Sequence, residues 1–201
     1  MTGQLLFSTS LISPEVQADL PPGYKIRPLA SDDYERGFLD TLTVLTEIGD
    51  ISKAQFLERF NYLKQHNHEY FTIVILSPDD RVVGAGTVFV ERKFIRNTGL
   101  VGHIEDIAVN KNQQGKKLGL RCGKSINGLL TIVLSSYIQS PGAAANLILI
   151  NVFIVLHLTY LVLTVILDCS EKNVPFYEKC GFTRKEVEMA WYCNEAPKAK
   201  L

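Results

Sequence analysis

The spacing of apolar and polar positions along the chain predicts a mixed α/β domain. Two β-rich runs, residues 70–76 and 82–91, flank a turn that contains Pro78 and two aspartates, and this pattern is typical of an antiparallel hairpin. Further strands are expected at residues 23–29, 102–109, 164–169 and 187–193.

Helical spacing appears in three places between these strands. Apolar residues from 34 to 48 predict one helix, with cap chemistry at residues 31–33. Ser52 followed by Gln55 is a capping box that opens a second helix, and Pro175 with Gly181 brackets a short third helix over residues 173–179. A turn over residues 111–119 leads into one more helix. The order β-α-α-β-β-β-α-β-α-β indicates one domain over residues 23–201, preceded by a loose N-terminal arm over residues 1–22.

The charge balance narrows the range of partners. The 201 residues carry 21 Lys and Arg against 21 Asp and Glu, so the chain lacks the basic excess that a dedicated nucleic-acid binder needs. The four cysteines form no C-x-x-C pair, which argues against a zinc site and favours free thiols. We therefore expect no metal ion. No basic region followed by an apolar run opens the chain, so we also expect no signal peptide and a cytoplasmic protein.

One segment departs from this pattern. Residues 143–167 are almost wholly apolar, and by length alone such a run could span a bilayer. A spanning helix would take the strand expected at residues 164–169 out of its sheet, so we regard membrane association as the weaker interpretation.

The most informative stretch is residues 104–119, in which a strand leads through Gln-Gly-Lys-Lys-Leu-Gly into a helix. The first backbone N–H groups of a helix lack internal partners and favour negative charge. Gly115 allows the backbone to approach a phosphate, and Lys116 and Lys117 add positive charge. These features predict a phosphate cradle but do not specify its ligand, since such a turn also serves as ordinary helix punctuation.

The turn resembles the pyrophosphate-binding motif Q/R-x-x-G-x-G/A of the GNAT superfamily of acyl-CoA N-acyltransferases, with Gln114 and Gly119 at matching positions. Residues 45–49, 91–95, 102–110 and 166–182 resemble the branch of that superfamily that acetylates glucosamine 6-phosphate. The resemblance implies a mostly antiparallel central sheet flanked by helices, acetyl-CoA as co-substrate, direct transfer without an acyl-enzyme, a role in UDP-N-acetylglucosamine biosynthesis, and a homodimer.

The resemblance also implies roles for particular residues. Tyr177 would protonate the departing thiolate, and Glu105 and Asp168 would act on the amine. The cofactor-binding residues implied are Ile107, Ala108, Val109, Gln114, Gly115, Lys116, Lys117, Leu118, Gly119, Leu120, Asn173 and Tyr177. The substrate-binding residues implied are Thr46, Lys93, Arg96, Glu105, Asp106, Ile107 and Asp168. Because adjacent residues of a strand face opposite sides, we expect one of Glu105 and Asp106 to serve the site and the other to serve structure.

The chain departs from the branch in four places. Lys117 stands at the first Gly of the motif, Arg96 where relatives carry His, and Tyr192 where some carry a phosphate-binding Arg. Residues 122–165 replace an amphipathic helix with nearly uncharged sequence. This segment could be a hydrophobic insertion, a divergent helix pair, or translated intron in an aberrant gene product, and we favour the last. Two alternatives to the main function therefore stay open, namely an impaired protein that only binds CoA or sugar phosphate, and an enzyme with another amine acceptor.

Overall fold

The computed structural model describes residues 3–113, 115–116, 118–119, 121–122 and 162–185. The chain divides into two compact units, Met1–Leu167 and Asp168–Leu201, and each is described by itself. The expected strand over residues 187–193 and nearly all of the atypical segment lie outside the described residues.

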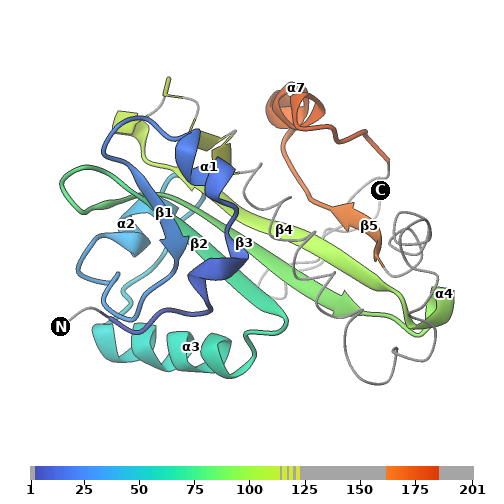
Figure 1. Cartoon of the computed structure of the whole chain (residues 1–201), viewed down its shortest axis with the longest axis horizontal. Coiled ribbons are helices and arrows are strands. Elements are labelled where there is room, and N and C mark those ends of the chain that lie inside the picture. The colour runs from blue at the N-terminus through green and yellow to red at the C-terminus, as the bar shows by residue number, and fades with distance from the viewer. Residues whose placement is uncertain (1–2, 114, 117, 120, 123–161, 186–201) are drawn as a thin grey trace, which may run out of the picture. The chain divides into compact units, whose positions relative to one another are not determined.

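The first unit is built on a five-stranded sheet with the order β1-β2-β3-β4-β5 (Figure 1). Neighbours are antiparallel from β1 to β4, whereas β5 runs parallel to β4. The strands are β1 (Lys25–Pro28), β2 (Tyr70–Leu76), β3 (Val82–Arg92), β4 (Leu100–Val109) and β5 (Val162–Ile166). The predicted hairpin and the strand before it are therefore confirmed, and β5 begins and ends slightly earlier than predicted.

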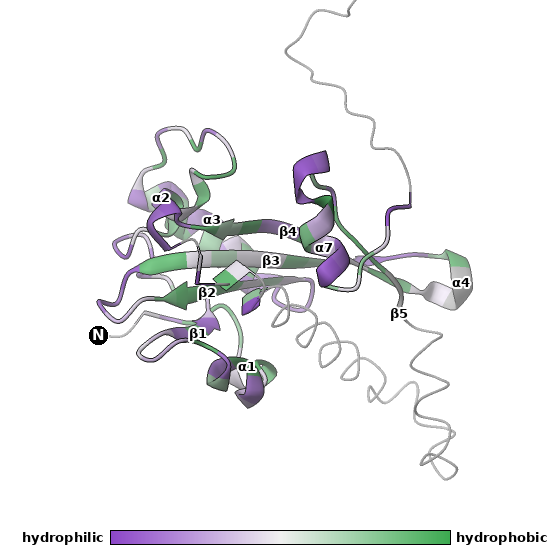
Figure 2. Cartoon of the chain, turned by 90° about the horizontal axis from the view of Figure 1, so that it is seen from above, coloured by the Kyte–Doolittle hydropathy of each residue, from purple (hydrophilic) through white to green (hydrophobic). Residues whose placement is uncertain are grey.

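The sheet core centres on β2, whose residues from Phe71 to Leu76 are all buried. A run buried on both faces needs cover on both sides of the sheet. Phe56 and Phe60 of α3 (Lys53–Gln65) are buried, and α2 (Phe38–Leu42) packs against β3 and β4. Figure 2 shows the apolar residues concentrated along the central strands.

Ser52 caps α3 as its sequence predicts. Its hydroxyl accepts a hydrogen bond from the backbone N–H of Gln55, while the Gln55 side chain accepts from the backbone N–H of Ser52 at 2.9 Å. These two bonds satisfy donors that the first turn of a helix cannot pair internally.

The helix expected over residues 34–48 is wrong in extent, because α2 covers only Phe38–Leu42. Gly37 adopts φ 83°, a left-handed conformation that an α-helix cannot contain, so no continuous helix runs from residue 34 into α2. Asp33 is fully buried and accepts two hydrogen bonds from the Arg27 guanidinium, at 2.6 and 2.7 Å, and one from the backbone N–H of Ala30. This carboxylate therefore fastens the chain to β1 and does not cap a long helix.

The N-terminal segment is packed and not loose. It contains a 3-10 helix at Thr9–Leu11 and α1 (Pro14–Ala18). Leu6 and Phe7 are buried, and the Phe7 ring meets Phe71 of β2 edge-on at 5.4 Å between centroids. The pattern missed this packing because these apolar residues follow neither a helical nor a strand period.

The second unit contains a 3-10 helix at Glu171–Asn173 and α7 (Val174–Lys179). Gly181 has φ 92°, and the N–H of Phe182 donates to the carbonyl of Tyr177 at 3.1 Å. This is the Schellman pattern that ends a helix at a C′ glycine, as the sequence predicts.

Candidate active site

The strand β4 carries a bulge in the middle of the predicted site. Ala85 of β3 pairs with Ala108, but Thr87 pairs with Glu105, so β4 has one extra residue between these pairs. Asp106 in this interval adopts φ 55°, a left-handed conformation that residues with a Cβ seldom take. A bulge re-aims backbone groups and side chains, and it is common beside active sites.

The bulge changes the expected roles of the two adjacent carboxylates. Glu105 and Asp106 are both exposed, so neither is a buried structural group, and the rule that neighbours face opposite sides does not hold across the bulge. Partial desolvation by the surrounding chain raises the pKa of Asp106 above its usual value.

The edge of β4 beyond the bulge differs from its first half. Pairing with β5 runs from Leu100–Val162 to His103–Ile166. In the part of the chain that the structure describes, no strand pairs with residues 104–109 on that edge. An extended ligand could add along it by main-chain hydrogen bonds, at the predicted contacts Ile107, Ala108 and Val109.

The turn that follows β4 is held in place by backbone hydrogen bonds. Asn110 N–H donates to the carbonyl of Val83 at 2.9 Å, and Gln113 N–H donates to the carbonyl of Asn110 at 2.8 Å. Gly115 is exposed with φ 86°, and nothing lies within 4 Å of where a Cβ would stand. The glycine is therefore required by the backbone conformation and leaves open space above the turn.

Leu118, Gly119, Arg121 and Cys122 are helical, as the predicted strand–turn–helix requires. Leu118 and Cys122 are 1% and 0% exposed, so they anchor this helix on the sheet. Burial raises the pKa of Cys122 to about 12, and its thiol donates to the carbonyl of Ala85 at 3.4 Å. A neutral, buried thiol of this kind is not a nucleophile.

Lys116 is held by neutral partners. Its ammonium donates to the Tyr24 hydroxyl and to the Gln113 Oε1, each at 2.7 Å. The Tyr24 hydroxyl in turn donates to the same Gln113 oxygen at 2.6 Å. Sequence reasoning missed Tyr24, because a single tyrosine at the start of the first expected strand carries no signal of contact with a turn more than ninety positions away. Gln114, Lys117 and Leu120 lie outside the described residues.

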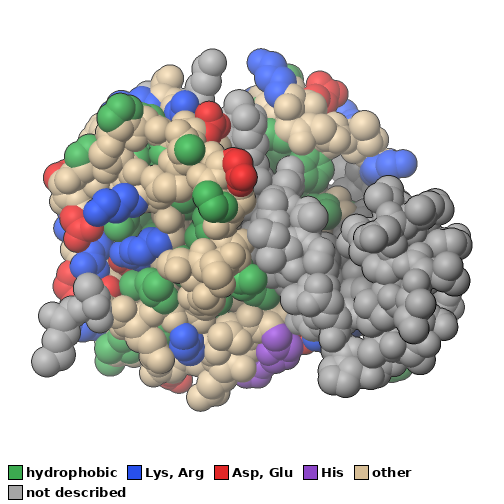
Figure 3. Space-filling view, in the orientation of Figure 1, with side chains coloured by type: hydrophobic (Ala, Val, Ile, Leu, Met, Phe, Trp, Pro, Cys, Tyr) green, Lys and Arg blue, Asp and Glu red, His purple; other side chains and the backbone are tan. Residues whose placement is uncertain are grey.

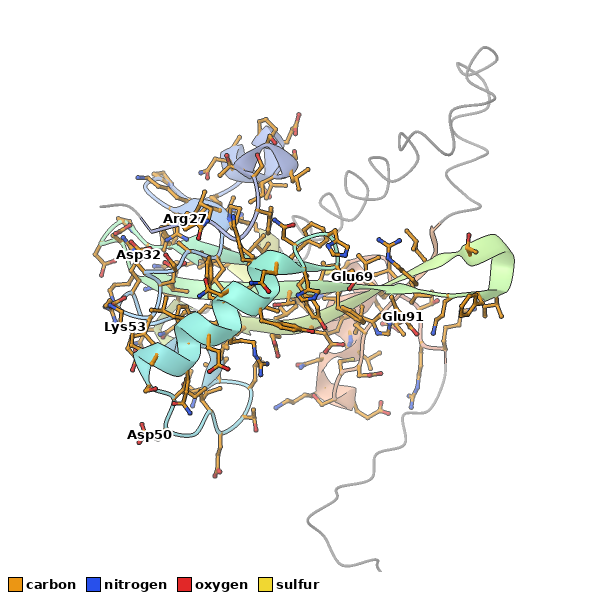
Figure 4. The ribbon with its side chains drawn as sticks, turned by 90° about the horizontal axis from the view of Figure 1, so that it is seen from below. Arg27, Asp32, Asp50, Lys53, Glu69 and Glu91 are labelled. Atoms are coloured by element: carbon orange, nitrogen blue, oxygen red, sulfur yellow. The ribbon has the colours of Figure 1, made fainter. Side chains whose placement is uncertain are left out.

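Lys93, predicted to contact a sugar phosphate, directly follows β3 and pairs with Glu91 at 2.5 Å. The second carboxylate oxygen of Glu91, Oε2, lies 3.0 Å from Nε2 of the His103 ring, within hydrogen-bond distance. The Lys93 ammonium first, and then His103, hold the pKa of Glu91 below its usual range. Glu91 lies on the hairpin arm well away from Arg27 and Lys53 (Figure 4).

Thr46 and Arg96 are the two other residues predicted to contact the sugar phosphate. Thr46 is exposed in the loop after α2, and α2 packs against β3 and β4. The side chain of Arg96 lies outside the described residues.

Three predicted residues belong to the second unit. Asp168 and Asn173 are exposed, and Asn173 immediately precedes α7. Tyr177 is half-buried, with edge-on ring contacts to Phe176 at 5.0 Å and Phe182 at 6.1 Å. These contacts fix the ring within its own unit.

Within the described part of the chain, no group of three or more His, Cys, Asp or Glu side chains could hold a metal ion. Cys122, Cys169 and Cys180 are free thiols. No helix among the described residues is long and apolar enough to cross a bilayer. On the face seen in Figure 3, basic and acidic side chains are interspersed over the described surface.

The bulged strand, its turn and the following helix define a class of protein. Residues 26–122 match the model of the Acetyltransferase (GNAT) family, and the chain belongs to that family of acetyltransferases. The expected GNAT fold and the class of enzyme are confirmed.

Relatives narrow the class further. The chain is 41% identical over 177 residues to glucosamine 6-phosphate N-acetyltransferase 1 of Dictyostelium discoideum, covering 88% of this chain and 95% of that protein. It is 40% identical over 170 residues to the glucosamine 6-phosphate N-acetyltransferase of Candida albicans, covering 85% and 96%. The crystal structure of the Arabidopsis thaliana glucosamine-6-phosphate N-acetyltransferase superposes with a TM-score of 0.68 at 31% identity, covering 85% of this chain and 99% of that chain. The resemblance to this branch of the family is therefore confirmed.

Proposed function

We propose that the chain transfers the acetyl group of acetyl-CoA to the amine of glucosamine 6-phosphate, giving N-acetylglucosamine 6-phosphate and CoA. The observation that carries this proposal is the bulged β4 edge that leads directly into the Gly115–Lys116 turn. Relatives that match nearly their whole length to this chain bear the name of this activity.

The pantetheine arm would lie along residues 107–109, and the pyrophosphate would lie over the turn. Main-chain hydrogen bonds suit the arm because they need no particular side chain. The exposed Gly115 and the nearby Lys116 suit the phosphates. Gln114, Lys117, Leu118, Gly119 and Leu120 complete the proposed cradle.

The chemistry requires a neutral amine to attack the thioester carbonyl carbon. The N–C bond forms first and gives a tetrahedral oxyanion, whose collapse breaks the C–S bond; a proton leaves the amine, and the thiolate gains one. Glu105 and Asp168 would hold the amine and accept its proton, and Tyr177 would protonate the thiolate. Asn173 would bind the pantetheine arm, and the backbone around the bulge would stabilise the oxyanion.

Binding the phosphate group of the sugar requires a site with positively charged and hydrogen-bonding side chains. Thr46, Lys93 and Arg96 would hold it, while Asp106 and Ile107 would contact the sugar. Because Lys93 already pairs with Glu91, the phosphate would compete with that carboxylate for the ammonium.

The same proposal includes a cytoplasmic homodimer that serves UDP-N-acetylglucosamine biosynthesis. Phe94 and Ile95, at the tip of the β3–β4 hairpin, are 97% and 66% exposed. Contiguous exposed apolar side chains are typical of protein–protein interfaces, so we assign this adjacent pair to the proposed dimer contact.

A thiol-release assay tests the function. Purified chain with acetyl-CoA is expected to release CoA when glucosamine 6-phosphate is added, and far less when glucosamine is added. Folded protein that binds acetyl-CoA but releases no thiol with any amine would favour the impaired-binding alternative. Release with a different amine alone would favour another acceptor.

A further inference from the structure

The N-terminal segment contacts the proposed phosphate turn through Tyr24 and the helix that follows the turn through Asp19. The Gln17 side chain of α1 donates to the carbonyl of Tyr24 at 3.0 Å and accepts from the N–H of Ile26 at 2.9 Å. Asp19 pairs with Arg121 at 3.7 Å, and the Arg121 guanidinium donates to the carbonyl of Lys116 at 2.6 Å. Residues far apart in sequence therefore hold both ends of this turn.

The Tyr24 side chain reaches the ammonium group of Lys116 in the turn. The tyrosine is 8% exposed, so the position of its ring is set by packing. Its hydroxyl is shared between Lys116 and Gln113, and the Lys116 ammonium lies 5.3 Å from the ring centroid. The lysine is exposed but is held from one side by a buried group.

These contacts orient the Lys116 charge without neutralising it. Among the described residues, no carboxylate lies within ion-pair distance of its ammonium, and its two hydrogen-bond acceptors are both neutral. An ammonium has three N–H donors, so one donor is left for a ligand. Holding a flexible lysine in one geometry beforehand removes part of the entropic cost of binding an anion.

We propose that Tyr24 is a positioning residue for the phosphate groups of the acyl-CoA, acting by holding Lys116 at the turn. This inference rests on the proposed function, since it takes acyl-CoA as the ligand of the turn. It makes the N-terminal segment part of the co-substrate site, although residues 13–24 lie outside the family's matched region of 26–122.

Tyr24→Phe tests the inference, because it keeps the buried ring and removes only the hydroxyl. The KM for acetyl-CoA and the Kd for CoA are expected to rise about tenfold, corresponding to about 1.4 kcal/mol. The turnover number and the KM for glucosamine 6-phosphate are expected to stay within about twofold. With acetyl-pantetheine, which has no phosphate, variant and wild type are expected to have equal kcat/KM.

A general structural role gives a different result, because it would lower activity with both acyl donors. Equal losses with acetyl-CoA and acetyl-pantetheine would overturn the proposal, as would unchanged CoA affinity in the variant. Tyr62→Phe on α3 is the matched control, since the Tyr62 side chain is 50% exposed and its ring packs against His66 and Tyr70, far from the turn in sequence; it should leave activity with both donors unaffected.

A double-mutant cycle adds a second readout. Lys116→Ala should weaken CoA binding, and adding Tyr24→Phe to it should cause little further loss if the hydroxyl acts through the lysine. Independent, additive losses would contradict the proposal.

If Tyr24→Phe does not fold, Gln113→Ala removes the other partner of the hydroxyl and is also expected to raise the Kd for CoA. Wild-type protein that fails to bind CoA would refute the proposed function itself, whereas equal CoA binding by wild type and variant would refute only the role of Tyr24.

Discussion

Asp106 has a left-handed backbone conformation, and its surroundings disfavour the charged form of its carboxylate. Its φ of 55° lies in a region that Asn and Asp tolerate better than other side chains with a Cβ. The raised pKa shows that ionisation is less favourable in the folded chain than in free solution. A residue that costs stability in this way, at a bulge of the proposed site, fits a role in binding or catalysis.

Asp106→Asn is expected to stabilise the fold at neutral pH and to lower acetyl transfer. A raised folded pKa means that wild-type stability is lost as pH rises from the unfolded pKa, about 3.9, through the folded value. The neutral Asn avoids this loss and accepts the same φ. Thermal unfolding at pH 4 and pH 7 should show a gain that grows with pH. A variant that is less stable at pH 7 and fully active would contradict this assignment.

Tyr177→Phe tests the proposed acid. The turnover number should fall by about a hundredfold, a typical effect of losing a general acid, while the Kd for acetyl-CoA changes little. Phe176→Leu in the same helix is a useful comparison, because it alters packing without removing a proton donor. Loss of affinity equal to the loss of turnover would count against the acid role.

At the scale of elements, the parts of the fold that could be predicted are those encoded locally. The β2–β3 hairpin follows from its β-rich runs and turn residues, and α3 follows from the Ser52–Gln55 capping box. The long helix over residues 34–48 failed because Gly37 takes a positive φ and Asp33 is used by Arg27, a contact made across the chain. The bulge at Asp106 and the Tyr24–Lys116 bond were unpredictable for the same reason, since each depends on tertiary neighbours.

The Ser52 cap gives a prediction at this scale. Ser52→Ala should lower the free energy of unfolding by about 1 kcal/mol, the usual value for losing an N-cap side chain. The turnover number should not change, since α3 contributes no proposed site residue. Denaturant unfolding of Ser52→Ala, Gln55→Ala and the double variant measures this, and a shared box predicts a double loss smaller than the sum. No change in the unfolding midpoint would show that the cap adds nothing.

At the scale of the whole molecule, the β3–β4 hairpin extends past the other strands and ends in α4 (Ile95–Thr98), as Figures 1 and 2 both show. Its tip carries the most exposed large apolar side chain among the described residues, Phe94. Burial of such a side chain is worth about 1.5–3 kcal/mol. The hairpin is therefore the described region that best fits the proposed dimer contact.

Phe94→Ser should weaken self-association by roughly tenfold or more, by the loss of that apolar burial. Light scattering after size-exclusion chromatography, over a range of concentrations, measures the shift from dimer to monomer. Tyr62→Ser, an exposed aromatic on α3, is the control and should leave association unchanged. A wild-type chain that is monomeric at every concentration would contradict the dimer.

The atypical sequence over residues 122–165 bears on the molecule as a whole, because it follows directly from the helix that the phosphate turn begins. Cys122 is buried in the helix that leaves this turn, and residues 123–161 lie outside the described part. Sequencing the transcript across codons 118–168 distinguishes the three accounts of this segment. A major message that lacks it would identify an aberrant product, and its presence there would exclude that account.

The central claim is that this chain moves an acetyl group from acetyl-CoA to the amine of glucosamine 6-phosphate. The most direct measurement incubates the purified chain with acetyl-CoA labelled in the acetyl group and identifies the product by mass spectrometry. The account predicts labelled N-acetylglucosamine 6-phosphate formed in equal amount to free CoA, with no labelled protein intermediate. Folded chain that binds acetyl-CoA and leaves the amino sugar phosphate unlabelled would contradict it.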